Sequence, residues 1–174
     1  YVGDSSFNIA CLQELGVTKV GDVLPIPVEF PETGVAKLTV CKAGGIRFLF
    51  VGRYIPNKKL EDVIDAFAYF RRYIDPEAKL DLVGNPDVSQ AYTELLHNKI
   101  LLTGFEDSIH LWGKVSQQEL QQLYEDADLY LCMSEHEGFC IPLLEAMWHQ
   151  LPVFAYDAGA VRETMGNAGV VFRD

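Results

Sequence analysis

The sequence predicts an α/β fold in which helices cover both faces of a parallel sheet. Two observations lead to this prediction. Short runs of β-branched and aromatic residues alternate with stretches of helical spacing, as they do in βαβ units. The first such run, GIRFLFVG at 45–52, is apolar almost throughout, which is typical of a strand buried on both faces. We therefore expect one compact domain over residues 45–174.

The remaining elements follow in chain order. The stretch 58–74 predicts a helix, because its apolar residues recur at helical spacing, with acidic residues early and arginines late, as the helix dipole favours. Ser116 and Glu119 form a capping box that opens another helix at 116–127. The other expected elements are strands at 79–84, 109–113, 128–133, 152–156 and 169–172, helices at about 89–98 and 142–149, and a helical turn at 160–165.

The first thirty residues have a different character. SSFNIACLQELG predicts a capped helix ended by Gly16, and VLPIPVEF predicts an extended segment fixed by Pro25 and Pro27. Residues 31–44 read as a connector.

The composition excludes several classes of protein. A net charge of −11 argues against nucleic acid as a partner. The four cysteines show no CxxC pairing, which favours reduced, buried thiols over a metal site or a disulfide framework. No apolar run approaches the roughly 18 residues of a membrane helix, and the first residues lack the pattern of a signal peptide, so we expect a soluble, cytoplasmic protein.

The charge is unevenly distributed along the chain. Residues 33–60 contain six basic residues and no acidic one, which leaves a balance of −17 on the rest of the sequence. Such a stretch can bind an anionic ligand locally.

The segment SEHEGFCIPLLEAM places two glutamates, Glu137 and Glu145, around a glycine and a proline. It follows a predicted strand, and Pro142 suits the first turn of the next helix. Ligands of parallel sheets bind beyond the carboxyl ends of the strands, where Gly138 allows a close approach of the backbone. Glu145 can accept hydrogen bonds from a vicinal diol such as a ribose. Helix-dipole stabilisation alone would explain Glu145 but not Glu137.

The segment VGRYIPNKKL follows the first predicted strand, at the same edge of the sheet. Arg53 and Lys58 can hold a diphosphate there, the arginine through its planar fork and the lysine as a point charge. The alternative explanation for these basic residues is that they only keep the surface soluble. However, lysines at a helix start oppose the helix dipole and need a partner.

These segments together resemble the nucleotide-binding half of retaining GT-B glycosyltransferases, in the large family that includes many lipopolysaccharide, capsule and mannosyl transferases. The resemblance covers about residues 45–173. It rests on VGRYIPNKK, LVGN, HLWGKVSQQEL, ADLYLCMSEHEGFCIPLLEAM, LPVFAYDAGAVRET and NAGVVF, in that order. It implies a Rossmann-like sheet, the C-terminal half of a GT-B fold, with its final helices missing. Residues 1–30 would then be the end of an N-terminal, acceptor-binding half and the hinge strand.

The resemblance also implies roles for individual residues. Arg53 and Lys58 would bind the donor's pyrophosphate, Glu137 the donor sugar and Glu145 the ribose hydroxyls. Backbone groups would add contacts to the phosphates, the sugar and the base; they belong to Gly138, Phe139, Cys140, Ile141, Leu143, Gly113 and Val115. Glu163 matches a frequent glutamate of less defined role.

The reaction implied is transfer of a hexose, mannose being one candidate, from a UDP-sugar or GDP-sugar with retention of configuration, without a metal or other cofactor. The acceptor would be a glycan, a lipid-linked molecule or a small molecule, and the full-length protein could associate peripherally with a membrane. Five positions depart from the family pattern: Lys59, Cys140 and Gln150 stand where glycine is usual, and Trp148 and His149 are bulkier than usual.

Other interpretations stay open at this point. They are an epimerase or phosphorylase of GT-B architecture and a non-catalytic nucleotide-sugar-binding module. A dinucleotide-binding dehydrogenase is disfavoured, because VGRYIP lacks the GxGxxG turn. The DAD at 126–128 resembles the metal-binding DxD of another glycosyltransferase fold, but its place between a helix and a strand favours structural use.

Overall fold

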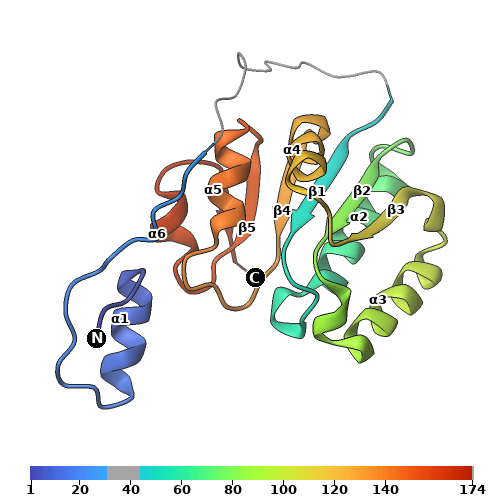
Figure 1. Cartoon of the computed structure of the whole chain (residues 1–174). Coiled ribbons are helices and arrows are strands. Elements are labelled where there is room, and N and C mark those ends of the chain that lie inside the picture. Colours follow the sequence, from blue (N-terminus) through green and yellow to red (C-terminus); the bar gives the residue numbers. More distant parts are fainter. Residues whose placement is uncertain (31–43, 174) are drawn as a thin grey trace.

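The computed structural model describes residues 1–30 and 44–173 (Figure 1). Within these residues, six strands form one sheet in the order β3-β2-β1-β4-β5-β6, and each neighbouring pair is parallel. The predicted fold class is thus confirmed. The strands are β1 (Arg47–Val51), β2 (Lys79–Val83), β3 (Ile109–Gly113), β4 (Leu129–Cys132), β5 (Val153–Tyr156) and β6 (Val170–Phe172).

Helices connect the strands and cover both faces of the sheet (Figure 1). The α-helices are α1 (Ser6–Glu14), α2 (Leu60–Tyr73), α3 (Gln90–Thr103), α4 (Gln117–Asp126), α5 (Ile141–Trp148) and α6 (Val161–Met165). Short 3-10 turns precede α2, α3 and β3; they are η1 (Pro56–Lys58), η2 (Pro86–Val88) and η3 (Glu106–Ser108).

Two apolar clusters show why the strands are apolar on both faces. One cluster joins β1 and β2 to α2 and α3, and the other joins β4 and β5 to α4, α5 and α6. Successive residues of β1 point to opposite faces, so that Phe48 and Phe50 belong to the first cluster and Leu49 to the second. All three are almost fully buried.

The elements expected between residues 45 and 172 are all present, most of them within two residues of the predicted bounds. The clearest difference is α3, which continues five residues beyond the expected end at 98. It continues because Ile100 still reaches the first apolar cluster, and Gly104, with φ of +73°, ends it. The capping box of Ser116 and Glu119 is confirmed, with both of its hydrogen bonds formed.

Residues 1–24 form a small unit beside the α5–α6 end of the sheet (Figure 1). Helix α1 begins after Ser5, whose side chain accepts a hydrogen bond from the Asn8 N–H, and it ends just before Gly16. The segment at 23–30, expected to be extended, forms no named strand among the described residues; its described pairing is one bridge between Gly3 and Val23. Prolines in that segment lack the N–H that a ladder needs. The expected connector, apart from Gly44, lies outside the described residues.

The strand order places a topological switch point between β1 and β4, which are neighbours although three helices separate them in sequence. Connections leave these two strands toward opposite sides of the sheet. In open α/β sheets, ligands bind outside the carboxyl ends of the strands at such a point. The loops at 52–59 and 133–140 therefore flank the expected binding position.

No helix in the described part of the chain has the length and apolar character needed to cross a membrane.

Candidate functional site

The loops that follow β1 and β4 contact each other directly at the switch point. The Glu135 N–H donates to the Asn57 carbonyl at 2.9 Å. Beside this bond, Lys58 Nζ donates to Glu137 Oε1 at 2.6 Å. Two residues assigned from separate motifs thus form one ion pair.

The pair of Lys58 and Glu137 is shielded from water. The side chains are 14% and 6% exposed, respectively. Charged side chains that are buried this far are tolerated only when they are paired, because each has lost most of its hydration. Lys58 lies beside the start of α2, where the helix dipole disfavours a cation. The Glu137 carboxylate is the partner that offsets this effect.

The loop carrying Glu137 is held in place by the segment before α6. The Ala160 N–H donates to the Glu137 carbonyl at 2.8 Å, and the Thr164 hydroxyl donates to the Phe139 carbonyl at 2.5 Å. Gly159 has φ of +57°, and a Cβ there would lie 2.2 Å from the Glu137 carbonyl oxygen. Only glycine permits this close approach of two backbone segments.

A Gly159→Ala variant is therefore expected to displace Glu137 and to lose stability. Gly104→Ala is the matched control, because Gly104 has a similarly positive φ but no atom within 4 Å of an added Cβ. The control should cost about 1 kcal/mol in free energy of unfolding, from backbone strain alone. Gly159→Ala should cost at least about 2 kcal/mol more, measured by urea unfolding. Equal costs for the two variants would contradict the close approach.

Arg53 lies immediately beyond β1 and its side chain is exposed. Two other described cations of the basic stretch have carboxylate partners, since Arg47 pairs with Asp81 at 3.6 Å and Lys59 with Glu135 at 3.1 Å. The hydrogen bond to Glu135 raises the pKa of Lys59. Among the residues that the structure describes, no carboxylate pairs with Arg53. Its guanidinium is thus available for an anionic ligand at the carboxyl end of β1.

Glu145 projects from α5 and is held by α4. The Tyr124 hydroxyl donates to Glu145 Oε2 at 2.8 Å. Burial, with the nearby Glu145 carboxylate, raises the pKa of Tyr124 well above its ordinary value, so Tyr124 is a neutral donor. The His149 ring stacks on Tyr124 at 5.0 Å between ring centroids, and burial lowers the pKa of His149. Tyr124 therefore positions Glu145, a role that the sequence analysis missed because Tyr124 reads as an ordinary core residue.

The backbone around the start of α5 is only partly available to a ligand. In the described residues, no acceptor takes a hydrogen bond from the N–H groups of Phe139, Cys140 or Ile141. The Leu143 N–H, by contrast, donates to the Cys140 carbonyl at 3.1 Å, so this predicted contact group is already used. A ligand anion can meet the three open N–H groups, as at other helix N-termini.

The other predicted backbone contacts lie beside the end of β2. The Gly113 carbonyl accepts from the Gly84 N–H at 3.1 Å, and Gly113 has φ of +68°. Val115 packs against the second apolar cluster. Both positions are therefore held by neighbouring parts of the fold, and no described hydrogen bond joins either to Lys58 or Glu137.

The three departures that replace a glycine of the family pattern share one backbone feature. Lys59, Cys140 and Gln150 have φ of 51°, 60° and 58°, and they are the non-glycine residues with positive φ in the described chain. Glycine adopts this conformation without the cost that a Cβ adds. Thus the backbone keeps the geometry that a glycine would favour at each position.

The N-terminal unit reaches the same loops. Glu163, whose role the sequence left undefined, accepts hydrogen bonds from the Ser6 N–H and hydroxyl at 2.9 and 3.0 Å. A Cβ on Gly138 would lie 2.8 Å from Asn8 Nδ2, and the ring of Phe7 lies 5.4 Å from that of His136. A hollow of about 510 Å³ in this unit contains none of the predicted site residues; Val2, Gly3, Asp4, Asn8, Cys11, Leu12, Leu15 and Leu24 line it.

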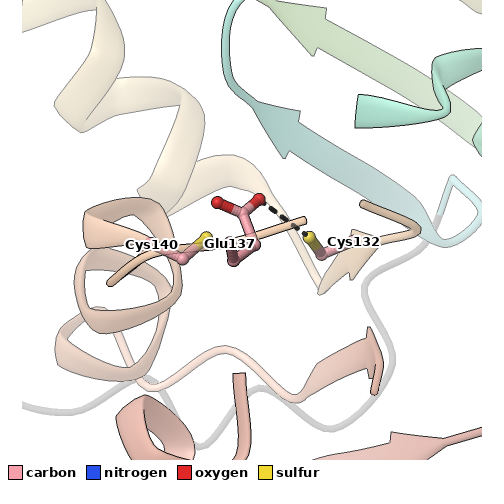
Figure 2. A group of neighbouring side chains, drawn as sticks. All are labelled: Cys132, Glu137 and Cys140. Atoms are coloured by element: carbon pink, nitrogen blue, oxygen red, sulfur yellow. Dashed lines mark hydrogen bonds between the residues drawn. The ribbon is translucent and has the colours of Figure 1, made fainter. Parts of the chain in front are cut away.

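Two cysteines that were expected to be inert core residues flank the glutamate loop (Figure 2). Cys132 ends β4 and Cys140 precedes α5, and both sulfurs lie close to Glu137. The contact with Cys140 lowers the pKa of Cys132. The DAD sequence lies at the opposite edge, where Asp128 accepts from the Arg47 N–H at 3.0 Å, so its structural use is confirmed.

The strand order and the crossover helices define a Rossmann-like α/β domain. Residues 41–173 match the family model of group 1 glycosyl transferases. The chain belongs to this family, and its architecture is that of the C-terminal half of GT-B glycosyltransferases.

Curated relatives show similarity over most of the chain. Mannosylfructose-phosphate synthase of Agrobacterium fabrum is 30% identical over 131 residues, which is 72% of this chain and 29% of that protein. GDP-mannose:cellobiosyl-diphosphopolyprenol alpha-mannosyltransferase of Xanthomonas campestris is 34% identical over 108 residues, which is 61% of this chain and 27% of that protein. The chain thus spans less than a third of the length of these two relatives.

A solved structure shows the same fold. HepE of Anabaena, in complex with UDP and glucose, superposes with a TM-score of 0.78 at 22% identity, covering 99% of this chain and 48% of that one.

Proposed function

We propose that this chain is the donor-binding part of a retaining, metal-independent hexosyltransferase that takes its sugar from a UDP-sugar or a GDP-sugar. The observation that carries the proposal is the 2.6 Å contact between Lys58 and Glu137, which places a cation and a carboxylate together at the switch point of the sheet. Family membership supports the reaction class. Relatives named as mannosyltransferases make mannose a candidate for the transferred sugar.

The diphosphate would bind between the β1 loop and the start of α5. Arg53 offers its exposed fork, and Lys58 has three N–H donors, of which Glu137 takes one. The open N–H groups at the start of α5 add further donors. Negative charge grows on the diphosphate as the sugar leaves, so these fixed donors stabilise the transition state more than the ground state.

Glu145 would bind the ribose and Glu137 the sugar. A carboxylate accepts about four hydrogen bonds, so the bond from Tyr124 leaves Glu145 able to accept from ribose hydroxyls. Glu137 is already paired with Lys58, which suits a ligand of the sugar better than a covalent nucleophile. Glycosidases that form covalent intermediates use a second carboxylate about 5 Å away as the acid.

The acceptor would bind to a part of the protein outside this chain. The curated relatives are more than three times as long as the matched region. We propose that an N-terminal half holds a glycan, a lipid-linked molecule or a small molecule against the donor, in the cytoplasm or at the surface of a membrane. The isolated chain would then bind the donor but transfer little sugar.

Two other functions would use the same fold. A GT-B phosphorylase would be expected to carry pyridoxal phosphate, which absorbance spectroscopy detects, and an epimerase would convert its sugar nucleotide without an acceptor. A non-catalytic nucleotide-sugar-binding module is the third possibility. The exposed Arg53, which has no carboxylate partner among the described residues, favours a transferase over a passive module, because it stands where leaving-group charge would develop.

Calorimetric titration of the chain with UDP, GDP and ADP, and then with their sugars, tests the proposal. We expect one nucleoside diphosphate to bind at least tenfold more tightly than the others, and EDTA to leave its affinity unchanged. Failure of all three to bind would refute donor binding, and binding that required a divalent cation would refute metal independence.

A further inference from the structure

Three possible metal ligands meet beside the candidate site. The sulfurs of Cys132 and Cys140 and a carboxylate oxygen of Glu137 all lie within 4.8 Å of one another, and the three side chains are buried. In Figure 2 the carboxylate lies between the two sulfur atoms, with the strand end on one side and the start of α5 on the other. The proposed transfer reaction uses neither thiol.

This donor set suits a zinc ion. Zn²⁺ accepts thiolate and carboxylate ligands, with Zn–S distances of about 2.3 Å and Zn–O distances of about 2.0–2.2 Å in a tetrahedral arrangement. Those distances place two sulfur ligands about 3.8 Å apart, so side-chain shifts of about 1 Å or less suffice here. Three protein ligands would leave the fourth position to water.

The surroundings balance the charge of such a site. Two thiolates and one carboxylate carry three negative charges, which a divalent cation and the Lys58 ammonium neutralise together. Lys58 lies 2.6 Å from Glu137 Oε1, which is also the carboxylate oxygen that the Cys132 sulfur contacts at 4.0 Å, so the ammonium and the cation would share the charge of one carboxylate. The Ser134 hydroxyl lies 3.3 Å from the Cys132 sulfur and can donate to a thiolate. Such outer contacts strengthen metal binding.

We propose that Cys132, Glu137 and Cys140 bind a thiophilic divalent cation of the Zn²⁺ type, and that this cation competes with the sugar nucleotide for Glu137. The two S–H bonds break and their protons pass to solvent while two metal–sulfur bonds form, and no electron is transferred. The cation has no part in sugar transfer; it inhibits donor binding. The competition rests on the proposed function, whereas the metal site does not.

Cobalt titration tests the metal site. In a C11S/C41S background, Cys132 and Cys140 are the remaining cysteines. Co²⁺ should then give a thiolate-to-cobalt charge-transfer band at one ion per chain, and Zn²⁺ should displace it. In that background, Cys140→Ser and Cys132→Ser should each lower the Co²⁺ affinity at least tenfold, and Glu137→Gln should lower it as well. Circular dichroism of each variant confirms that it remains folded.

The possible results separate the two halves of the proposal. Absence of the band, or a Co²⁺ affinity that Cys140→Ser leaves unchanged, would overturn the metal site. In the second arm, Zn²⁺ should raise the apparent Kd for UDP-glucose or GDP-mannose at least tenfold, and Cys132→Ser should abolish this effect. If either nucleotide binds with equal affinity with and without Zn²⁺, competition is refuted. If neither binds at all, the proposed function fails while the cobalt result still decides the metal site.

Discussion

An Arg53→Ala variant is expected to bind the preferred nucleoside diphosphate at least tenfold more weakly, a loss of about 1.4 kcal/mol. The reason is that the exposed guanidinium has no carboxylate partner in the described chain and lies at the carboxyl end of β1. For the proposed transfer reaction, loss of one fixed donor to a developing oxyanion should slow the rate by about a hundred to a thousandfold. Calorimetry on the chain and initial rates of the proposed transfer measure the two effects.

Two controls identify the cause of that loss. Arg72→Ala removes the same charge near the far end of α2, so it should leave nucleotide affinity nearly unchanged. Arg53→Lys retains the charge but loses the planar fork, and its affinity should fall between those of the wild type and the alanine variant. Unchanged affinity in Arg53→Ala would refute the role of Arg53.

A Lys58→Met variant is expected to lose both stability and nucleotide affinity. The substitution leaves the Glu137 carboxylate, 6% exposed, without its partner. Removing one member of a buried ion pair costs about 3–5 kcal/mol, because the remaining charge stays buried and uncompensated. Urea unfolding measures the stability, and calorimetry measures the diphosphate affinity.

The double variant Lys58→Met/Glu137→Gln separates these two effects. It leaves no buried charge at the position of this pair, so it should recover most of the lost stability while its diphosphate affinity remains low. Lys59→Met is the neighbouring control; its partner Glu135 is more than half exposed, and stability should hardly change. If the double variant proved less stable than Lys58→Met alone, the pair would not be the source of the lost stability.

The strands and helices from residue 45 onward could be predicted because each one shows a local signal. The apolar run of β1 and the capping box at Ser116 depend on residues close together in sequence. The end of α3 could not be predicted as well, because its last turns are held by contacts of Ile100 with the rest of the first apolar cluster.

The sequence predicted which residues belong to the candidate site better than it predicted the contacts between them. Motif spacing predicted that Lys58 and Glu137 would lie at one edge of the sheet. It did not predict that they bond to each other, since 79 residues separate them in sequence. The thiol pair was missed for a similar reason, because Cys132 and Cys140 become neighbours only when the loop between them folds back. Pairwise contacts of this kind depend on the path of the loop.

The most direct test of the account is a crystal structure of the chain with its tightest-binding nucleoside diphosphate. We expect the two phosphates to lie within hydrogen-bond distance of the Arg53 guanidinium and Lys58 Nζ, with the ribose hydroxyls on the Glu145 carboxylate. A diphosphate bound elsewhere, such as in the hollow beside α1, with Arg53 and Lys58 both directed away from it, would contradict the central claim.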